Sequence, residues 1–184
     1  MLNREGIFNL FSELDSQLTN KTNIIILGGT FFVLKDLRES SKDRDIIVEG
    51  TQYREVSSLL PQIASRYEMT VDIMSNRTLG DIILPENYLK SLKLYRRARK
   101  LIFVRIWTLS PYFILISKIS RYTEKDKKDI ELILNSGKFT IRKRILKNNI
   151  RVINFGSRKN IFNRNYEEFL EKYGDKLKLN IFGY

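Results

Sequence analysis

The feature that most constrains the fold of this chain is a pair of glycines at the end of a short apolar run. Residues 23–27 are rich in isoleucine, which predicts a strand buried on both faces, and Gly28 and Gly29 follow directly. Helical spacing of apolar residues resumes over 30–38, so the pair is predicted to make the turn from strand to helix. A helix that begins there offers free backbone N–H groups to a phosphate, with Thr30 beside the glycines.

Two acids separated by one residue lie on the next predicted strand. Asp43 and Asp45 fall within 43–48, where side chains alternate between faces, so both carboxylates are expected on one face. Two neighbouring anions repel unless a cation joins them, which favours a metal site. Asp72, on a third predicted strand over 69–74, adds another carboxylate if that strand lies beside the second. The acids could also be ordinary strand-end residues, and Asp43 could cap a turn.

The order of predicted elements indicates an α+β fold, in which a small mixed sheet with helical cover is followed by a helical C-terminal part. We expect the α/β core over 1–109 and the helical region over 110–184. The glycine- and serine-containing segment 156–160 is predicted to be a linker. The expected helices cover 5–18, 30–38, 52–66, 111–120, 124–135, 138–149 and 164–173, and the expected strands cover 23–27, 43–48, 69–74, 92–94 and 102–107.

Two missing residue types narrow the possible chemistry. The chain has 184 residues and contains neither histidine nor cysteine, which excludes Ser-His-Asp triads, disulfides and thiolate or imidazole metal sites. A metal ion could be held only by oxygen ligands, which suit Mg²⁺ or Mn²⁺. Nucleotidyl transfer uses such carboxylate-bound ions to clamp the attacking and leaving oxygens.

The glycine pair, the paired acids and the later acid resemble the pattern of the nucleotidyltransferase superfamily, which has a polymerase-beta-like fold. A second segment over 110–130, with one lysine and then an Arg … Lys-Asp-x-x-Asp run, resembles one branch of that superfamily. The branch includes nucleotidyltransferase-like proteins of abortive-infection toxin–antitoxin systems. The resemblance covers roughly 22–135, and it implies a nucleotidyltransferase core followed by a helical part.

The resemblance implies a role for each residue of the first pattern. Gly28, Gly29 and Thr30 would hold the triphosphate of an NTP, which would be the substrate. Asp43 and Asp45 would bind Mg²⁺ or Mn²⁺. The residue between the two acids is usually apolar in this branch and is an arginine here, which leaves the packing of that strand open.

The resemblance also assigns roles further along the chain. Asp72 would be the third carboxylate and a metal ligand. Polymerase-like members use this third carboxylate to activate the acceptor hydroxyl. Lys118 would touch a phosphate or the base pocket, and Asp126 or Asp129 would be the acid of the second segment. Other readings are open: Lys118 could face solvent on an amphipathic helix, and acids in the first turn of a helix are favoured by its dipole alone.

The charge of the chain indicates an anionic partner. The formal net charge is +12 and the sequence pI is about 9.9, a balance that favours nucleic acid. Cations gather over 90–100 and 138–164 with aromatic residues between them, a pattern that suits RNA because phosphates pair with cations and bases stack on rings. A merely solubilising surface would look similar. A protein partner is also compatible with this composition.

No part of the sequence indicates a membrane segment. Apolar runs stay shorter than the roughly 18 residues that a membrane span needs. The first residues lack the continuous apolar stretch of a signal peptide, so we expect a cytoplasmic protein.

Four functions are compatible with these observations. The first is transfer of a nucleoside monophosphate from an NTP to an acceptor, such as RNA or tRNA, with two metal ions. The second is a non-catalytic protein of the same fold that binds nucleic acid or protein. A small-molecule enzyme of the antibiotic-modifying kind would need an acidic cleft for polycationic substrates, which the net charge disfavours. A basic DNA binder would leave the spacing of glycines and acids to coincidence.

Overall fold

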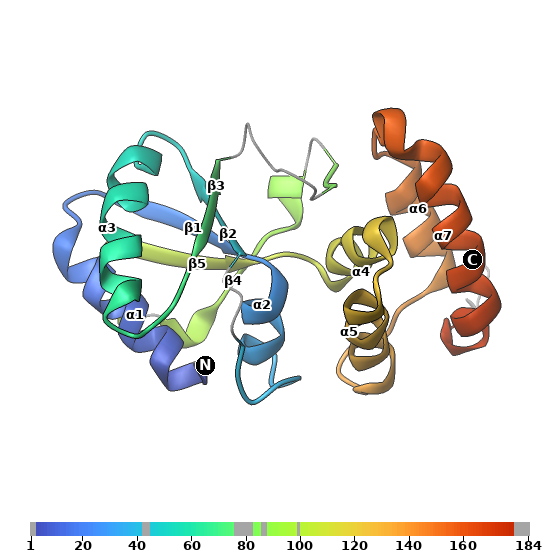
Figure 1. The fold of residues 1–184 in the computed structure, drawn as a ribbon, viewed down its shortest axis with the longest axis horizontal. Helices are drawn as coiled ribbons and strands as arrows, with labels where there is room; N and C mark the ends of the chain where they lie inside the picture. The colour runs from blue at the N-terminus through green and yellow to red at the C-terminus, as the bar shows by residue number, and fades with distance from the viewer. Residues whose placement is uncertain (1–2, 42–44, 76–82, 86–87, 99, 179–184) are drawn as a thin grey trace. The chain divides into compact units, whose positions relative to one another are not determined.

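The computed structural model describes residues 3–41, 45–75, 83–85, 88–98 and 100–178. The chain divides into two compact units, which we describe separately (Figure 1). Unit 1 comprises Met1–Gly80 and Ser91–Leu109, and unit 2 comprises Asp81–Lys90 and Ser110–Tyr184.

Unit 1 contains a five-stranded mixed sheet with the spatial order β3-β2-β1-β5-β4. β1 is antiparallel to β2 and parallel to β5, β3 is parallel to β2, and β4 is antiparallel to β5. The isoleucines of β1 are fully buried because this central strand is covered on both faces, as its composition predicts. The strands are β1 (Thr22–Ile26), β2 (Asp45–Glu49), β3 (Asp72–Ser75), β4 (Lys93–Leu94) and β5 (Val104–Thr108).

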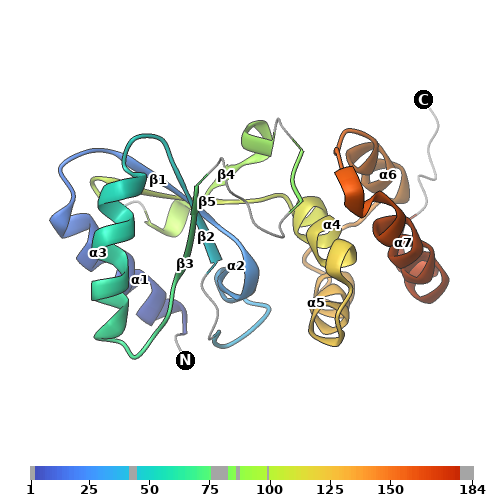
Figure 2. The same ribbon diagram turned by 45° about the horizontal axis from the view of Figure 1, so that its top comes forward.

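Three helices complete unit 1: α1 (Arg4–Gln17), α2 (Gly28–Leu34) and α3 (Tyr53–Ser65). The Asn3 side chain caps α1 by accepting a hydrogen bond from the Gly6 N–H. The two views in Figures 1 and 2 show α1 and α3 side by side, and the two helices are in contact. The predicted α+β fold with helical cover is confirmed.

A buried carboxylate ties α1 to the start of β5. Asp15 Oδ1 accepts hydrogen bonds from the backbone N–H groups of Phe103 and Val104 at 2.7 and 2.6 Å, and its Oδ2 accepts one from Ile102 at 2.9 Å. Three donors compensate the cost of burying the charge. The contact spans 87 residues of sequence, so it fixes where the chain re-enters the sheet.

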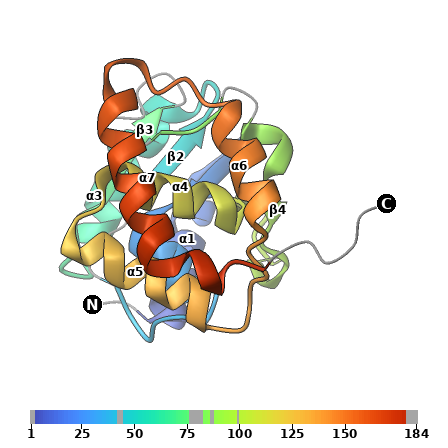
Figure 3. The same ribbon diagram turned by 90° about the vertical axis from the view of Figure 1, so that its right-hand side faces the viewer.

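The described residues of unit 2 form four α-helices: α4 (Pro111–Arg121), α5 (Glu124–Asn135), α6 (Lys143–Arg151) and α7 (Lys159–Tyr173). Ser110 caps α4, and Thr123 and Asp126 form a capping box at the start of α5. α4 contacts the other three helices, whose arrangement is visible in Figure 3. Asn165 joins α7 to α4 by donating to the carbonyl oxygens of Ile119 and Ser120 at 3.1 and 3.3 Å.

Several predicted boundaries differ from the structure. β3 begins at Asp72 and not at residue 69, because the chain after α3 closes with a Met69 N–H to Ala64 carbonyl hydrogen bond and a positive φ at Glu68. α6 begins at Lys143 and not at residue 138. The predicted linker over 156–160 is wrong, since Gly156–Arg158 is a 3₁₀ helix that leads directly into α7.

The remaining 3₁₀ segments lie at the connections. They are Tyr88–Ser91, Arg96–Ala98 and Gly174–Lys176, and the second of these falls in the cation-rich segment 90–100. Among the described residues, every helix is too short or too polar to cross a bilayer.

Candidate active site

The pairing of β2 with β3 brings together two of the predicted carboxylates. Asp45 is the first residue of β2 and Asp72 the first of β3, and the two are register partners in this parallel pair. Side chains of register partners project from the same face, and neighbouring strands lie about 4.8 Å apart. Asp45 is half-buried and Asp72 is exposed, so the pair sits at an accessible edge of unit 1.

Gly28 packs against Asp45, one member of this acidic pair. Its φ of +50° is in the left-handed region, and a Cβ at this position would lie 2.9 Å from Asp45 Cγ and closer still to Asp45 Oδ2. No side chain fits there, so the glycine leaves the space that the carboxylate occupies. The preceding Leu27 N–H donates to the Asp45 carbonyl at 2.9 Å, which fixes the end of β1 beside the start of β2.

The other two residues of the predicted phosphate-binding turn are buried. Gly29 and Thr30 lie in the first turn of α2, which confirms the predicted passage from strand to helix. The Thr30 side chain lines a small interior cavity together with Ile7 and Leu60. This position places Thr30 in the packing of unit 1, whereas Gly28 is partly accessible.

The first acid of the predicted pair lies outside the described residues. Asp43 belongs to 42–44, together with the arginine that separates it from Asp45. Within the described ranges, no group of three or more Asp or Glu side chains is arranged to hold a metal ion. The described part of the predicted metal site is therefore the pair Asp45 and Asp72.

The predicted residues of the second segment form an ionic cluster inside unit 2. The Lys118 ammonium on α4 lies 3.0 Å from Asp126 Oδ1 and 2.7 Å from Asp129 Oδ2, both on α5. All three side chains are buried, with at most 6% of their surface exposed. A buried charge must be paired, and this cluster pairs a lysine with two acids on the neighbouring helix.

Asp126 has the largest number of partners in this cluster. Arg121 donates to its carboxylate at 2.8 and 3.3 Å, and the Thr123 hydroxyl donates at 2.8 Å. Burial by itself would raise the pKa of Asp126, but the Arg121 hydrogen bonds, the Lys118 charge and Thr123 outweigh it and lower the pKa to about 2. These contacts join α4 to α5 and explain the burial of all three predicted residues, while their roles in substrate binding stay predictions.

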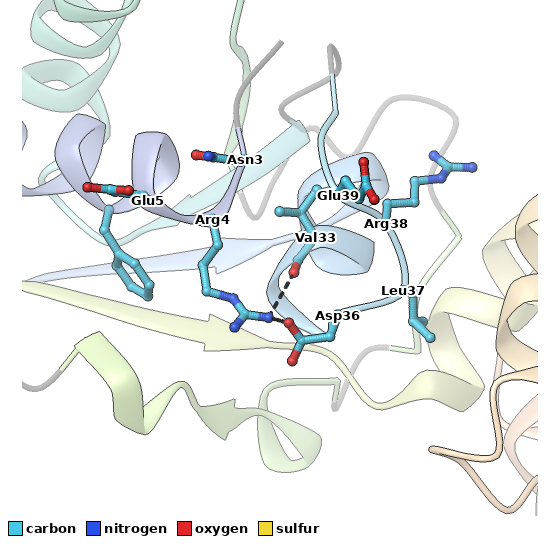
Figure 4. A pocket seen from close by; sticks show the side chains of 9 residues that line it. Asn3, Arg4, Glu5, Val33, Asp36, Leu37, Arg38 and Glu39 are labelled. Carbon is cyan, nitrogen blue, oxygen red and sulfur yellow. Dashed lines mark hydrogen bonds and ion pairs between the residues drawn. The ribbon is translucent and has the colours of Figure 1, made fainter.

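A surface pocket of unit 1 lies at the C-terminal end of α2. It measures about 720 Å³, and its lining includes Arg4, Phe8 and Arg38. Figure 4 shows Arg4 reaching across it to Asp36, with which it forms an ion pair, and to the Val33 carbonyl. None of its described lining residues belongs to the predicted site, so the cavity and the acidic edge are separate features.

The sequence patterns did not predict the role of Asp15, whose carboxylate accepts three backbone hydrogen bonds. It lies among the apolar residues of α1, next to Leu14, and three backbone N–H groups explain why an acid occupies a buried position. An acid adjoining the apolar stripe of an amphipathic helix was the available signal.

One family model matches the chain over residues 5–174, which is most of its length, and it describes a "Nucleotidyltransferase of unknown function (DUF6036)". The chain belongs to this family. Membership of the nucleotidyltransferase family confirms the superfamily resemblance, and the abortive-infection branch stays a prediction. No curated protein and no solved structure matches the chain.

Proposed function

We propose that this chain transfers a nucleoside monophosphate from an NTP to an acceptor hydroxyl at the edge formed by Asp45, Asp72 and Gly28. The observation that carries the proposal is the register pairing of two carboxylates beside a glycine that no other residue could replace without displacing one of them. Family membership supports nucleotidyl transfer as the reaction. The register pairing of Asp45 with Asp72 supports this edge of unit 1 as the active site.

The donor set at this edge suits Mg²⁺ or Mn²⁺. Carboxylate oxygens are the ligands that these ions prefer, and two neighbouring carboxylates gain from a shared cation because they otherwise repel. Asp43, two residues before Asp45, would add a carboxylate on the same face if the strand pattern extends to it. We assign Asp45 and Asp72, with Asp43, as the residues that would hold the ions. Charge neutralisation around the α-phosphate and the pyrophosphate is the chemistry that the bound ions would supply.

The proposed reaction is a displacement at the α-phosphorus of the NTP. The acceptor oxygen forms a bond to this phosphorus, the bond from the phosphorus to the bridging oxygen of the β-phosphate breaks, and pyrophosphate leaves. Asp72 is the more exposed of the two described acids, and we assign it to accept the proton of the acceptor hydroxyl. Gly28, which is partly accessible, would let the triphosphate approach the backbone at the start of α2.

RNA is the acceptor that we favour. A net charge of +12 attracts a polyanion and disfavours a cationic small-molecule acceptor. A place in abortive infection would follow from the predicted branch.

The test is transfer of label from α-³²P-labelled NTPs to total cellular RNA in the presence of Mg²⁺ or Mn²⁺. We expect labelled RNA with the wild-type chain and a loss on the order of 100-fold or more with Asp45→Asn or Asp72→Asn, since a metal site supplies several kcal/mol. Glu49→Gln, at the opposite end of β2, is the matched control and should keep full transfer.

Two results would overturn the proposal. One is the absence of labelled RNA with each of the four NTPs and either metal ion. The other is undiminished transfer by a folded Asp45→Asn variant, because the activity would then lie elsewhere.

A further inference from the structure

All of the positive excess of residues 110–184 lies in one segment. Residues 132–166 contain nine Lys or Arg and no Asp or Glu. The rest of 110–184 contains eight Lys or Arg and eight Asp or Glu, so it is neutral in sum. Such a division indicates a binding surface, because charges that serve only solubility are interspersed with charges of the opposite sign.

Four of the nine cations of this segment lie on α6. Lys143, Lys147 and Arg151 follow one another at four-residue intervals, which places them in a row with a rise of about 6 Å between neighbours, and Arg144 lies beside the row. All four side chains are exposed. Within the described part of the chain, none of the four forms an ion pair, so their charges are available to a partner.

Several acids of unit 2 pair with cations on α4, α5 and α7. Asp126 and Asp129 on α5 pair with Lys118, and Glu131 pairs with Lys172 on α7 at 3.4 Å. Glu124 pairs with Lys127 at 3.1 Å. The acidic and basic residues that neutralise one another thus lie on α4, α5 and the second half of α7, away from the α6 sequence.

The apolar side of α6 is already used for packing. Leu146 is fully buried and Ile141, just before the helix, is buried as well. A basic amphipathic helix that binds a membrane inserts its apolar side into the lipid. Since this side packs inside unit 2, the exposed cations favour a hydrated polyanion over a lipid surface.

An aromatic residue follows the basic row in the sequence. Phe155, four residues after Arg151, is partly exposed and stacks on Phe162 with ring centroids 4.0 Å apart. Tyr166 and Phe169 continue this column of rings along α7. A partly exposed ring four residues beyond a row of cations suits an unpaired base, because bases of a single strand can stack on aromatic side chains while phosphates contact Lys and Arg.

We propose that the exposed side of α6, together with Phe155, holds single-stranded RNA, with the phosphates along Lys143, Lys147 and Arg151. This surface belongs to unit 2 alone, and it binds whether or not unit 1 transfers a nucleotide. Its occupant is a strand of RNA and not a duplex, because a paired base cannot stack on Phe155.

The test measures binding of a fluorescein-labelled single-stranded RNA of mixed sequence to the full chain by fluorescence anisotropy over a range of KCl concentrations. Each neutralised phosphate of a single strand contributes about 0.7 to the slope of log K against log[salt]. The triple variant Lys143→Gln, Lys147→Gln, Arg151→Gln should therefore lower the slope by about 2 and weaken binding at least tenfold at low salt. Glutamine suits an exposed helix, so the fold is retained.

The matched control removes the same number of exposed cations elsewhere. Lys21→Gln, Arg54→Gln and Lys128→Gln together should change the slope far less, although the net charge falls equally. Phe155→Leu should weaken binding of the single strand about tenfold and leave the salt slope unchanged, because stacking releases no counterions.

Three outcomes would overturn the proposal. The triple variant and the control could bind equally, which would show a non-specific effect of net charge. An RNA duplex could bind as tightly as the single strand. Vesicles containing phosphatidylserine could bind in an α6-dependent way while RNA does not. Binding by an Asp45→Asn variant separates this surface from the proposed transferase activity.

Discussion

Asp72 lies directly opposite Asp45 on the neighbouring parallel strand, so the two carboxylates leave one face of the sheet at the end where β1 finishes. Their sequence separation hides this relationship, which depends on β3 adding to the outer edge of β2. Gly28 approaches the same point from β1 and is kept free of a side chain by the Asp45 carboxylate. Three segments thus meet at one edge of unit 1.

The first prediction concerns metal binding in the absence of any NTP. Mn²⁺ at a hundredfold excess over its Kd should stabilise the wild-type chain by about 2.7 kcal/mol, because the ion binds only the folded state. Asp45→Asn and Asp72→Asn should each abolish this Mn²⁺-dependent rise in Tm, whereas Glu49→Gln should retain it. Differential scanning fluorimetry with and without Mn²⁺ checks the result, and an unchanged rise in both Asn variants would contradict the assignment.

Gly28→Ala should abolish Mn²⁺ binding and nucleotidyl transfer in addition to lowering stability. Left-handed backbone costs a non-glycine residue roughly 1–2 kcal/mol, and the added Cβ must also displace the Asp45 carboxylate. Gly137→Ala is the matched control, since its φ is +67° and nothing lies within 4 Å of the added Cβ. Both variants should lose stability in urea denaturation, and only Gly28→Ala should also lose Mn²⁺ binding and nucleotidyl transfer.

Acid should weaken unit 2 through Asp126. The pKa of this carboxyl is lowered from 3.8 to about 2 in the folded chain, so its contribution to stability is complete above the unfolded value and is lost as the pH falls from about 4 to 2. The contribution corresponds to roughly 2 kcal/mol. Urea unfolding followed by circular dichroism from pH 6 to pH 2 should show the gap between wild type and Asp126→Asn narrowing over that interval. A constant gap would place the stabilising interactions elsewhere.

The Lys118→Met variant tests whether Lys118, in the segment 110–130, stabilises the packing of unit 2 or contacts the substrate. Removing the ammonium leaves Asp126 and Asp129 buried without their shared partner, and breaking such a pair costs about 3–5 kcal/mol. Lys128→Met, at an exposed position of α5, should stay within about 0.5 kcal/mol of wild type in the same urea denaturation. A Lys118→Met chain of normal stability with weakened NTP binding would instead assign this lysine to the substrate.

Local sequence signals predicted most elements of the fold. The isoleucine run of β1, the glycine pair that opens α2, the Ser-Pro start of α4 and the Thr123 cap of α5 all act within a few residues. The prediction that the Asp43 and Asp45 carboxylates share one face of a strand rests on side-chain alternation alone, which is also a local signal. Asp72 is predicted as a third acid only if its strand lies beside the second. The structure shows this strand pairing.

Contacts between distant residues account for what the sequence did not reveal. The segment before α6 is extended because Lys178 N–H donates to the Ile141 carbonyl and the Lys143 N–H donates to the Lys178 carbonyl, and no local pattern encodes this bridge. The burial of Lys118 likewise depends on two acids from another helix. An amphipathic pattern alone would place a lysine at the solvent-facing side.

The Asp15 contact has a consequence for synthesis of the chain. β5 is the parallel neighbour of the central strand, and its entrance is fixed by a carboxylate made 87 residues earlier. A growing chain can form α1 and the β1–β2 pair early, but the sheet of unit 1 stays incomplete until β5 has left the ribosome exit tunnel. Such distant closure slows folding. Ribosome-bound chains that end before residue 104 lack the parallel neighbour of β1 and should therefore be sensitive to protease.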